Sequence, residues 1–168
     1  MSDTFHDMRS RLHGITEEEF LWMPIPGSWT VFRDDRGWRE HHYEEPDPEP
    51  APFTTIAWRL THVAMCKVMY HEHAFGSASI TWETLETPST PEAALEMLDT
   101  GHALLTEDLA EHSDGDLERS VPTNWGERWP AWRIFWTMIH HDAHYGGELG
   151  VLRDLYRLTG GGAVRGSG

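Results

Sequence analysis

The residues that decide the fold are 130–158, PAWRIFWTMIHHDAHYGGELGVLRDLYRL. Apolar side chains recur at every third or fourth position of this stretch, which is the pattern of an amphipathic helix. The residues that define its inward face are Ile134, Met138, Leu149, Leu152 and Tyr156. At about 1.5 Å per residue the helix spans roughly 40 Å. Gly146 and Gly147 interrupt its middle, and since glycine costs a helix about 1 kcal/mol relative to alanine, we expect close packing or a bend there.

A first helix is predicted near residues 4–22. Gly14 interrupts its pattern, and Thr16 with Glu19 forms a capping box from which the helix continues. Residues 24–53 then contain prolines, glycines and acidic side chains that prevent a regular helix. Because a loop of this length is uncommon in a small domain, we expect it to have a function.

Two more helices are predicted near residues 54–75 and 91–111, each preceded by a threonine that can cap it. With the first and the last helix they make four, and helices of these lengths bury their apolar faces against one another in a bundle. The sequence therefore predicts an all-α fold, an antiparallel four-helix bundle with a long loop between the first and second helices. We expect one domain over residues 1–160 and a flexible Gly-rich tail over residues 161–168.

The composition excludes several classes of protein. The 28 Asp and Glu against 13 Lys and Arg give a net charge of −15, which disfavours binding to nucleic acid or to an anionic membrane surface. No apolar run reaches the roughly 20 residues of a membrane span, and the first residues lack the features of a signal peptide. Cys66 is the one cysteine, so an internal disulfide is excluded. These features predict a cytoplasmic protein.

Three of the twelve histidines suggest a metal site. His62 lies beside the buried stripe of its helix, where an imidazole needs a partner. A core histidine bonded to a carbonyl or a tyrosine is the alternative. His141 and His144 lie on one flank of the last helix, next to Tyr145 at the centre of its inward face. Together with His62 they would supply three nitrogens and leave a fourth position open, as in catalytic zinc sites. Glu148, on the same flank, is a further ligand or a hydrogen-bond acceptor for one.

The other histidines have simpler explanations. His140 points away from the inferred core, and His71 and His73 lie near a helix end, where the helix dipole favours cations. Solvated positions explain the histidines of the polar loop and the third helix, which are His41, His42, His102 and His112. The sequence contains no phosphate-binding glycine loop, no Gly-x-Ser-x-Gly and no HExxH, which disfavours the hydrolases that use these motifs.

Four stretches resemble the DinB-like (DinB/YfiT) superfamily of bacterial metal-binding four-helix bundles. They are residues 19–29 (EFLWMPIPGSW), 52–63 (PFTTIAWRLTHV), 74–76 (AFG) and 144–156 (HYGGELGVLRDLY). They resemble most closely the actinobacterial branch related to the bundle domain of mycothiol-dependent maleylpyruvate isomerase. The order and spacing of the stretches carry the resemblance more than any one of them.

The resemblance implies a histidine on the second helix and a pair at i and i+4 on the last helix, around one divalent metal ion, zinc or nickel. His62 and His141 match the first two positions. The third falls on Tyr145, with His144 just before it. Three outcomes are open: His144 substitutes, Tyr145 is a weak oxygen ligand, or the site is degraded. Shifting the frame to His140 and His144 restores the spacing but turns the pair away from the core.

The resemblance also implies an activity. Family members with an assigned reaction use low-molecular-weight thiols, so this chain is expected to be a metal-dependent thiol S-transferase or isomerase with a cofactor such as mycothiol. The metal would keep the thiol deprotonated. Arg59 and Arg153 are candidates for binding the cofactor's carboxylate, with solvated surface arginines as the alternative. The loop over residues 24–53 would wall the pocket. The expected partners are a small-molecule thiol and an electrophile.

Two other functions remain alternatives. One is a non-catalytic bundle that binds a metal or a small ligand, in which Tyr145 marks the loss of chemistry. The other is a stress-response protein that acts through contacts with partners, with some of the nine tryptophans at an interface and a homodimer left open.

Overall fold

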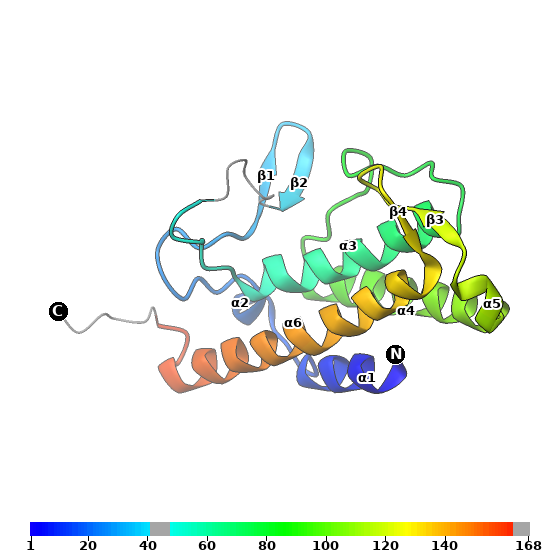
Figure 1. Ribbon diagram of the computed structural model, residues 1–168. Coiled ribbons are helices and arrows are strands. Elements are labelled where there is room, and N and C mark those ends of the chain that lie inside the picture. Colours follow the sequence, from blue (N-terminus) through cyan, green and yellow to red (C-terminus); the bar gives the residue numbers. More distant parts are fainter. Residues whose placement is uncertain (41–47, 163–168) are drawn as a thin grey trace.

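The computed structural model describes residues 1–40 and 48–162 and has four main helices (Figure 1). The main helices are α1 (Ser2–Arg11), α3 (Ile56–Ala74), α4 (Pro91–Glu111) and α6 (Ala131–Thr159), and the short helices are α2 (Glu17–Phe20) and α5 (Asp114–Leu117). The all-α four-helix bundle is confirmed. Residues 41–47 of the long loop and residues 163–168 of the expected tail lie outside the described residues.

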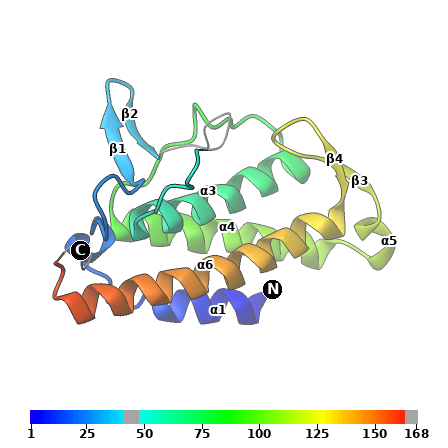
Figure 2. The same ribbon diagram turned by 60° about the vertical axis from the view of Figure 1, so that its left-hand side comes forward.

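The helices form two parallel pairs that run antiparallel to each other. α1 lies beside α6 and α3 beside α4, and the members of each pair run in the same direction (Figures 1 and 2). Between the pairs the direction reverses. Phe5 of α1 contacts His102 of α4, and the later residue Arg9 of α1 contacts the earlier residue Asp99 of α4, so these two helices run in opposite directions. The connection from α3 to α4 therefore returns along the length of the bundle before α4 begins.

Helix ends follow the capping residues in the sequence. The Thr55 hydroxyl accepts a hydrogen bond from the Trp58 amide at 3.2 Å, and Gly160 ends α6 with a φ of 60°. Thr16 accepts from the Glu19 amide at 3.2 Å, but the Glu19 carboxylate binds another helix and does not return to Thr16. Only half of the predicted capping box forms there.

Two short antiparallel hairpins were not predicted. β1 (Val31–Asp34) pairs with β2 (Gly37–Glu40) inside the loop expected to be irregular, and β3 (Ser120–Pro122) pairs with β4 (Arg128–Pro130) just before α6. A two-residue turn makes the first hairpin, in which Asp34 accepts from the Arg36 amide at 2.8 Å. The expectation of an irregular loop is wrong for this part, because a tight turn needs few residues and leaves a weak sequence signal.

Two ion pairs lie inside the bundle. Lys67 of α3 donates to the Asp142 carboxylate of α6 at 2.9 Å, and neither side chain is exposed. Arg153 of α6 donates to the Glu19 carboxylate of α2 at 2.6 and 2.9 Å. Both pairs use α6, so this helix is held by charge to α3 and to α2.

His102 is buried, which corrects the expectation of a solvated position. Its ring stacks on Phe5 of α1 with 3.6 Å between the centroids. Burial and then the nearby Lys67 charge lower the pKa of His102 to about 4. The apolar pattern of α4 did not show that α1 would cover this side chain.

Gly146 lets α1 approach α6, and its neighbour Gly147 does not. A Cβ on Gly146 would lie 2.9 Å from the Met8 Cβ, whereas a Cβ on Gly147 would meet no atom within 4 Å. We expect Gly147→Ala to stabilise the protein by up to about 1 kcal/mol through helix propensity. Gly146→Ala should instead destabilise it by about 1–2 kcal/mol, because overpacking outweighs that gain.

Denaturant unfolding of the two variants beside the wild type measures this difference. The two substitutions are chemically identical and adjacent in one helix, so each is the control for the other. Equal stabilities would show that α1 moves away from α6 without cost.

Candidate functional site

Three rings meet between the middle of α3 and the middle of α6. His62 comes from α3, and His141 and Tyr145 lie one turn apart on α6. The centroid of the His62 ring lies 6.4 Å from that of His141 and 5.8 Å from that of Tyr145, and His141 and Tyr145 are 5.6 Å apart. The rings therefore form a nearly equilateral triangle.

The sequence places two more side chains beside His62, one turn away on each side. Trp58 stacks on the imidazole with 4.8 Å between centroids and 5° between planes. The Cys66 Sγ lies 3.5 Å from the His62 Nε2. The spacing of four residues on one helix predicts both contacts, but only the structure shows that both partners are buried.

His141 carries the clearest sign of a site. Its Nδ1 is buried and has no hydrogen-bond partner. Burial, followed by the neighbouring His62, lowers the pKa of His141 to about 4. The imidazole is therefore neutral near pH 7 and has a lone pair to offer.

A pocket of about 380 Å³ lies against this triangle. Tyr145 and Trp58 line it and also contact His62, so they lie between the pocket and His62. The long loop supplies a further wall, as the sequence suggested. The remaining lining residues are Trp29, Pro48, Ala51, Pro52, Thr54, Arg59, His144 and Glu148.

Arg59 gives the pocket a positive group. Its guanidinium forms an ion pair with Glu148, and its Nε is buried without a hydrogen-bond partner. Burial lowers the pKa of Arg59, and the nearby Tyr145 acts in the opposite direction. The free N–H of the guanidinium suits an anionic group on a ligand.

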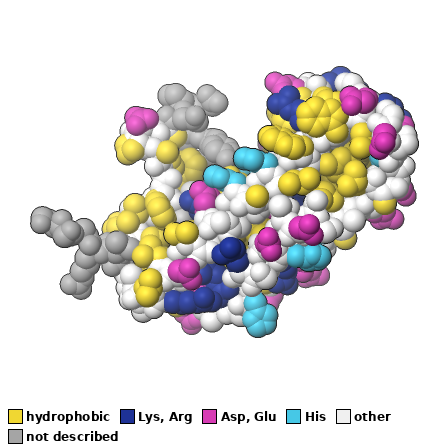
Figure 3. Space-filling model, turned by 60° about the horizontal axis from the view of Figure 1, so that its bottom comes forward, with side chains coloured by type: hydrophobic (Ala, Val, Ile, Leu, Met, Phe, Trp, Pro, Cys, Tyr) yellow, Lys and Arg dark blue, Asp and Glu magenta, His cyan; other side chains and the backbone are white. Residues whose placement is uncertain are grey.

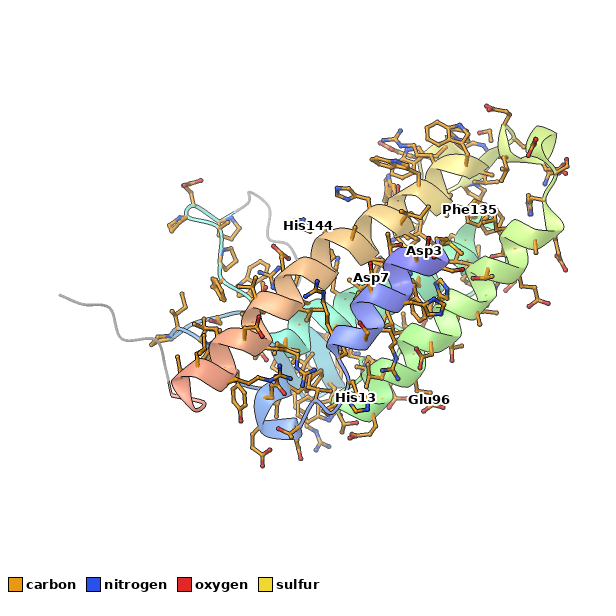
Figure 4. All side chains as sticks on the ribbon, turned by 90° about the horizontal axis from the view of Figure 1, so that it is seen from below. Asp3, Asp7, His13, Glu96, Phe135 and His144 are labelled. Atoms are coloured by element: carbon orange, nitrogen blue, oxygen red, sulfur yellow. The ribbon has the colours of Figure 1, made fainter. Side chains whose placement is uncertain are left out.

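The structure separates the other site residues predicted from the sequence. His144 stands at the pocket rim with a side chain 53% exposed, on the side of α6 away from Asp3 and Asp7 of α1 (Figure 4). It stacks on His140, so the frame-shifted pair lies together on the outside of the helix. Arg153 is 3% exposed and binds Glu19.

Arg153 therefore has a structural role in the bundle instead of the cofactor-binding role considered from the sequence. Its Nη1 group donates to the carbonyl oxygen of Arg11 at the end of α1 and to that of His13, which follows the helix. Four of its five N–H groups are therefore engaged inside the bundle, and Arg153 does not line the pocket.

The donor set is short of conventional metal ligands. Within the part of the chain that the structure describes, no three His, Cys, Asp or Glu side chains come together in a group that could hold a metal ion. The triangle supplies two imidazoles, and a phenol takes the third corner. Two imidazoles and a phenol are donors that a divalent metal accepts, and a metal held by these three would have further positions for water or a ligand.

Comparison with protein families identifies the fold. The family model of the DinB superfamily matches residues 1–149. The chain belongs to the DinB superfamily. Among solved structures, this DinB protein is similar to a DinB-like protein from Bacillus cereus, with a TM-score of 0.57 and 17% identity over 98% of this chain and 92% of the other.

That similarity concerns the fold of the DinB bundle alone, because the identity is low. No curated protein sequence matches the chain. Among the described helices, none combines the length and apolar character that a membrane span requires.

Proposed function

We propose that this DinB protein binds a divalent metal ion, zinc or nickel, through His62 and His141, with the Tyr145 hydroxyl as an oxygen donor. The observation that carries the proposal is the triangle of the three rings, with a buried His141 Nδ1 that has no partner. Imidazole nitrogens suit both metals. The stacking of Trp58 on His62 holds the His62 imidazole in place.

The proposed activity is that of a thiol S-transferase or isomerase, as in the actinobacterial branch of the superfamily related to mycothiol-dependent isomerase. A bound metal would supply a Lewis acid that keeps a thiol deprotonated near neutral pH. Arg59 would bind a carboxylate of the thiol or of the electrophile, and Glu148 holds the guanidinium in place. The apolar faces of Trp29 and Trp58 would bind the electrophile.

A non-catalytic role is the second candidate. The phenol of Tyr145 in a position where a third conventional ligand is expected favours it, because a weaker donor set binds metal less tightly. In that case the protein would bind a metal or a small ligand in the same pocket without turning over a thiol.

The metal assignment is tested by His62→Ala and His141→Ala, with His140→Ala as the matched control on the outer side of α6. Elemental analysis after loading with zinc or nickel should give about one metal per chain for the wild type and the control, and none for the two variants. In a competition titration with a chromophoric chelator, Tyr145→Phe should lower the affinity for the metal, and Tyr145→His should raise it. Unchanged stoichiometry in His62→Ala would contradict the assignment.

The activity is tested separately on the metal-loaded protein. The protein is incubated with mycothiol and a chromogenic aryl halide. Halide should be released only when thiol and aryl halide are both present, since a carbon–sulfur bond forms as the halide leaves. Arg59→Met should raise the KM for a thiol that carries a carboxylate, such as glutathione, more than for mycothiol, which has none. Stoichiometric metal with no turnover of several thiols would favour the non-catalytic role.

A further inference from the structure

Four ring side chains form a continuous exposed row on α6. They are Trp132, Trp136, His140 and His144, at every fourth position, and are called the α6 ridge below. Trp132 is 43% exposed and Trp136 is 56% exposed. A tryptophan is usually buried in a monomeric protein, so two such side chains on one helix face need an explanation.

The rings of the ridge are already ordered against one another. Trp136 stacks on His140 with 5.5 Å between centroids, and His140 stacks on His144 with 5.8 Å. Figure 3 shows hydrophobic side chains gathered over the β3–β4 hairpin and the start of α6, with histidines next to them along the helix. Ordered aromatic rings lose little entropy when a partner covers them.

The charge of this face differs from that of the whole protein. Residues 131–147 contain a single acidic side chain, Asp142, which is buried and paired with Lys67. The chain as a whole carries 28 acidic residues and a net charge of −15. The two acids next to the ridge are already engaged: Glu127 accepts from the Trp129 indole at 3.0 Å, and Glu148 pairs with Arg59 and lies 3.5 Å from the His144 Nε2.

We propose that the α6 ridge is the interface of a homodimer, in which two copies pack antiparallel across a two-fold axis near the middle of the ridge. A row of side chains at i, i+4, i+8 on one helix packs into the groove beside the equivalent row of another helix, at a crossing angle of about 50°. Two chains of −15 repel each other over most of their surface, and this acid-poor stretch of α6 is where they can meet with the least repulsion.

The antiparallel arrangement links the interface to the pocket. With the axis between Trp136 and His140, Trp132 of one copy lies opposite His144 of the other. His144 lines the pocket of its own copy. An aromatic side chain of the second copy would therefore cover the pocket rim and restrict the entry of water.

A stable dimer needs more contact than the four ridge side chains, and exposed aromatic groups near the start of α6 extend the surface. A standard interface buries about 800 Å² on each partner, and tryptophans are the residues that most often carry its affinity. Trp125, which is 45% exposed and packs on Trp129 at 4.9 Å between centroids, extends the apolar surface from the hairpin.

The experiment is sedimentation velocity of the full chain from low micromolar to several hundred micromolar. The wild type should form a dimer. Trp136→Glu places an acidic group at two positions of a two-fold interface and should raise the dissociation constant at least about 100-fold. Leu158→Glu is the matched control, because Leu158 is 85% exposed on the same helix and roughly 27 Å along the axis from His140.

Trp132→Glu repeats the test at the other end of the row, and circular dichroism spectra verify that each variant stays helical. A dimer in the wild type and Leu158→Glu, with monomers in both tryptophan variants, supports the interface. The proposal is overturned if the wild type stays monomeric at every concentration, which would leave the ridge to a different partner. It is also overturned if Trp136→Glu still dimerises or if Leu158→Glu does not.

Discussion

Replacing Lys67 by methionine is expected to lower the free energy of unfolding by about 3–5 kcal/mol. The Lys67 ammonium lies 2.8 and 2.9 Å from the two carboxylate oxygens of Asp142, and neither side chain is exposed. Burial lowers the pKa of Lys67 and raises that of Asp142, and each partner's charge opposes the shift of the other. The variant leaves the Asp142 carboxylate in the core without its cation.

The double variant Lys67→Met with Asp142→Leu separates the charge effect from lost packing. Because it removes both charges, it should recover most of the stability that the single variant loses. Arg9→Met is a surface control, since Arg9 pairs with Asp99 in an exposed ion pair worth less than about 1 kcal/mol. Urea unfolding at one pH, without added metal, measures all four proteins. A double variant as unstable as Lys67→Met, or more so, would contradict the prediction.

The second large effect is expected from Arg153→Met, which should also cost about 3–5 kcal/mol. The Arg153 guanidinium makes two bonds to Glu19 and further bonds to the carbonyl oxygens of Arg11 and His13. Its loss leaves the Glu19 carboxylate, 3% exposed, and two carbonyl groups without donors.

Arg157→Met, one turn later on the same helix, is the matched control. Arg157 is mostly exposed and lies 3.8 Å from Asp154, so its loss should change stability by less than about 0.5 kcal/mol. Thermal unfolding measures stability, and metal stoichiometry below the melting temperature measures the site. A variant of Arg153 that keeps its stability but loses affinity for a carboxylate-bearing thiol would reassign this arginine to the pocket.

The sequence was sufficient for the three later main helices because their signals are local, whereas the first helix predicted near residues 4–22 is divided into α1 and α2 by residues 12–16. The Thr55 cap, the glycine that ends α6 and the apolar stripes all depend on residues within a few positions of one another. It also placed His62 beside a buried stripe and Tyr145 at the centre of the inward face of α6, where the structure has them. His144 was expected on the flank of α6, about 100° around the helix from Tyr145, and in the structure this flank is the exposed pocket rim.

The contacts between side chains of different helices could not be predicted from the sequence. Periodicity shows that Lys67 faces inward, but not that an aspartate 75 residues later faces it. Glu19 fits a local capping box equally well in sequence, and only the tertiary fold decides that Arg153 takes its carboxylate. His102 has acidic neighbours in the chain, yet the packing of α1 buries it. In each case the deciding residue lies on another helix.

The two buried ion pairs also define the axial position of α6. Apolar helix faces can slide past each other by a turn, about 5.4 Å, and still remain packed. Such a slide would leave Lys67, Asp142, Glu19 and Arg153 inside the bundle without partners. We infer that these charges act as a register lock, which excludes the alternative alignments of α6. His141 and Tyr145 lie on α6 between or beside the locked positions, so the alignment that keeps the charges paired is also the one that brings these rings to His62.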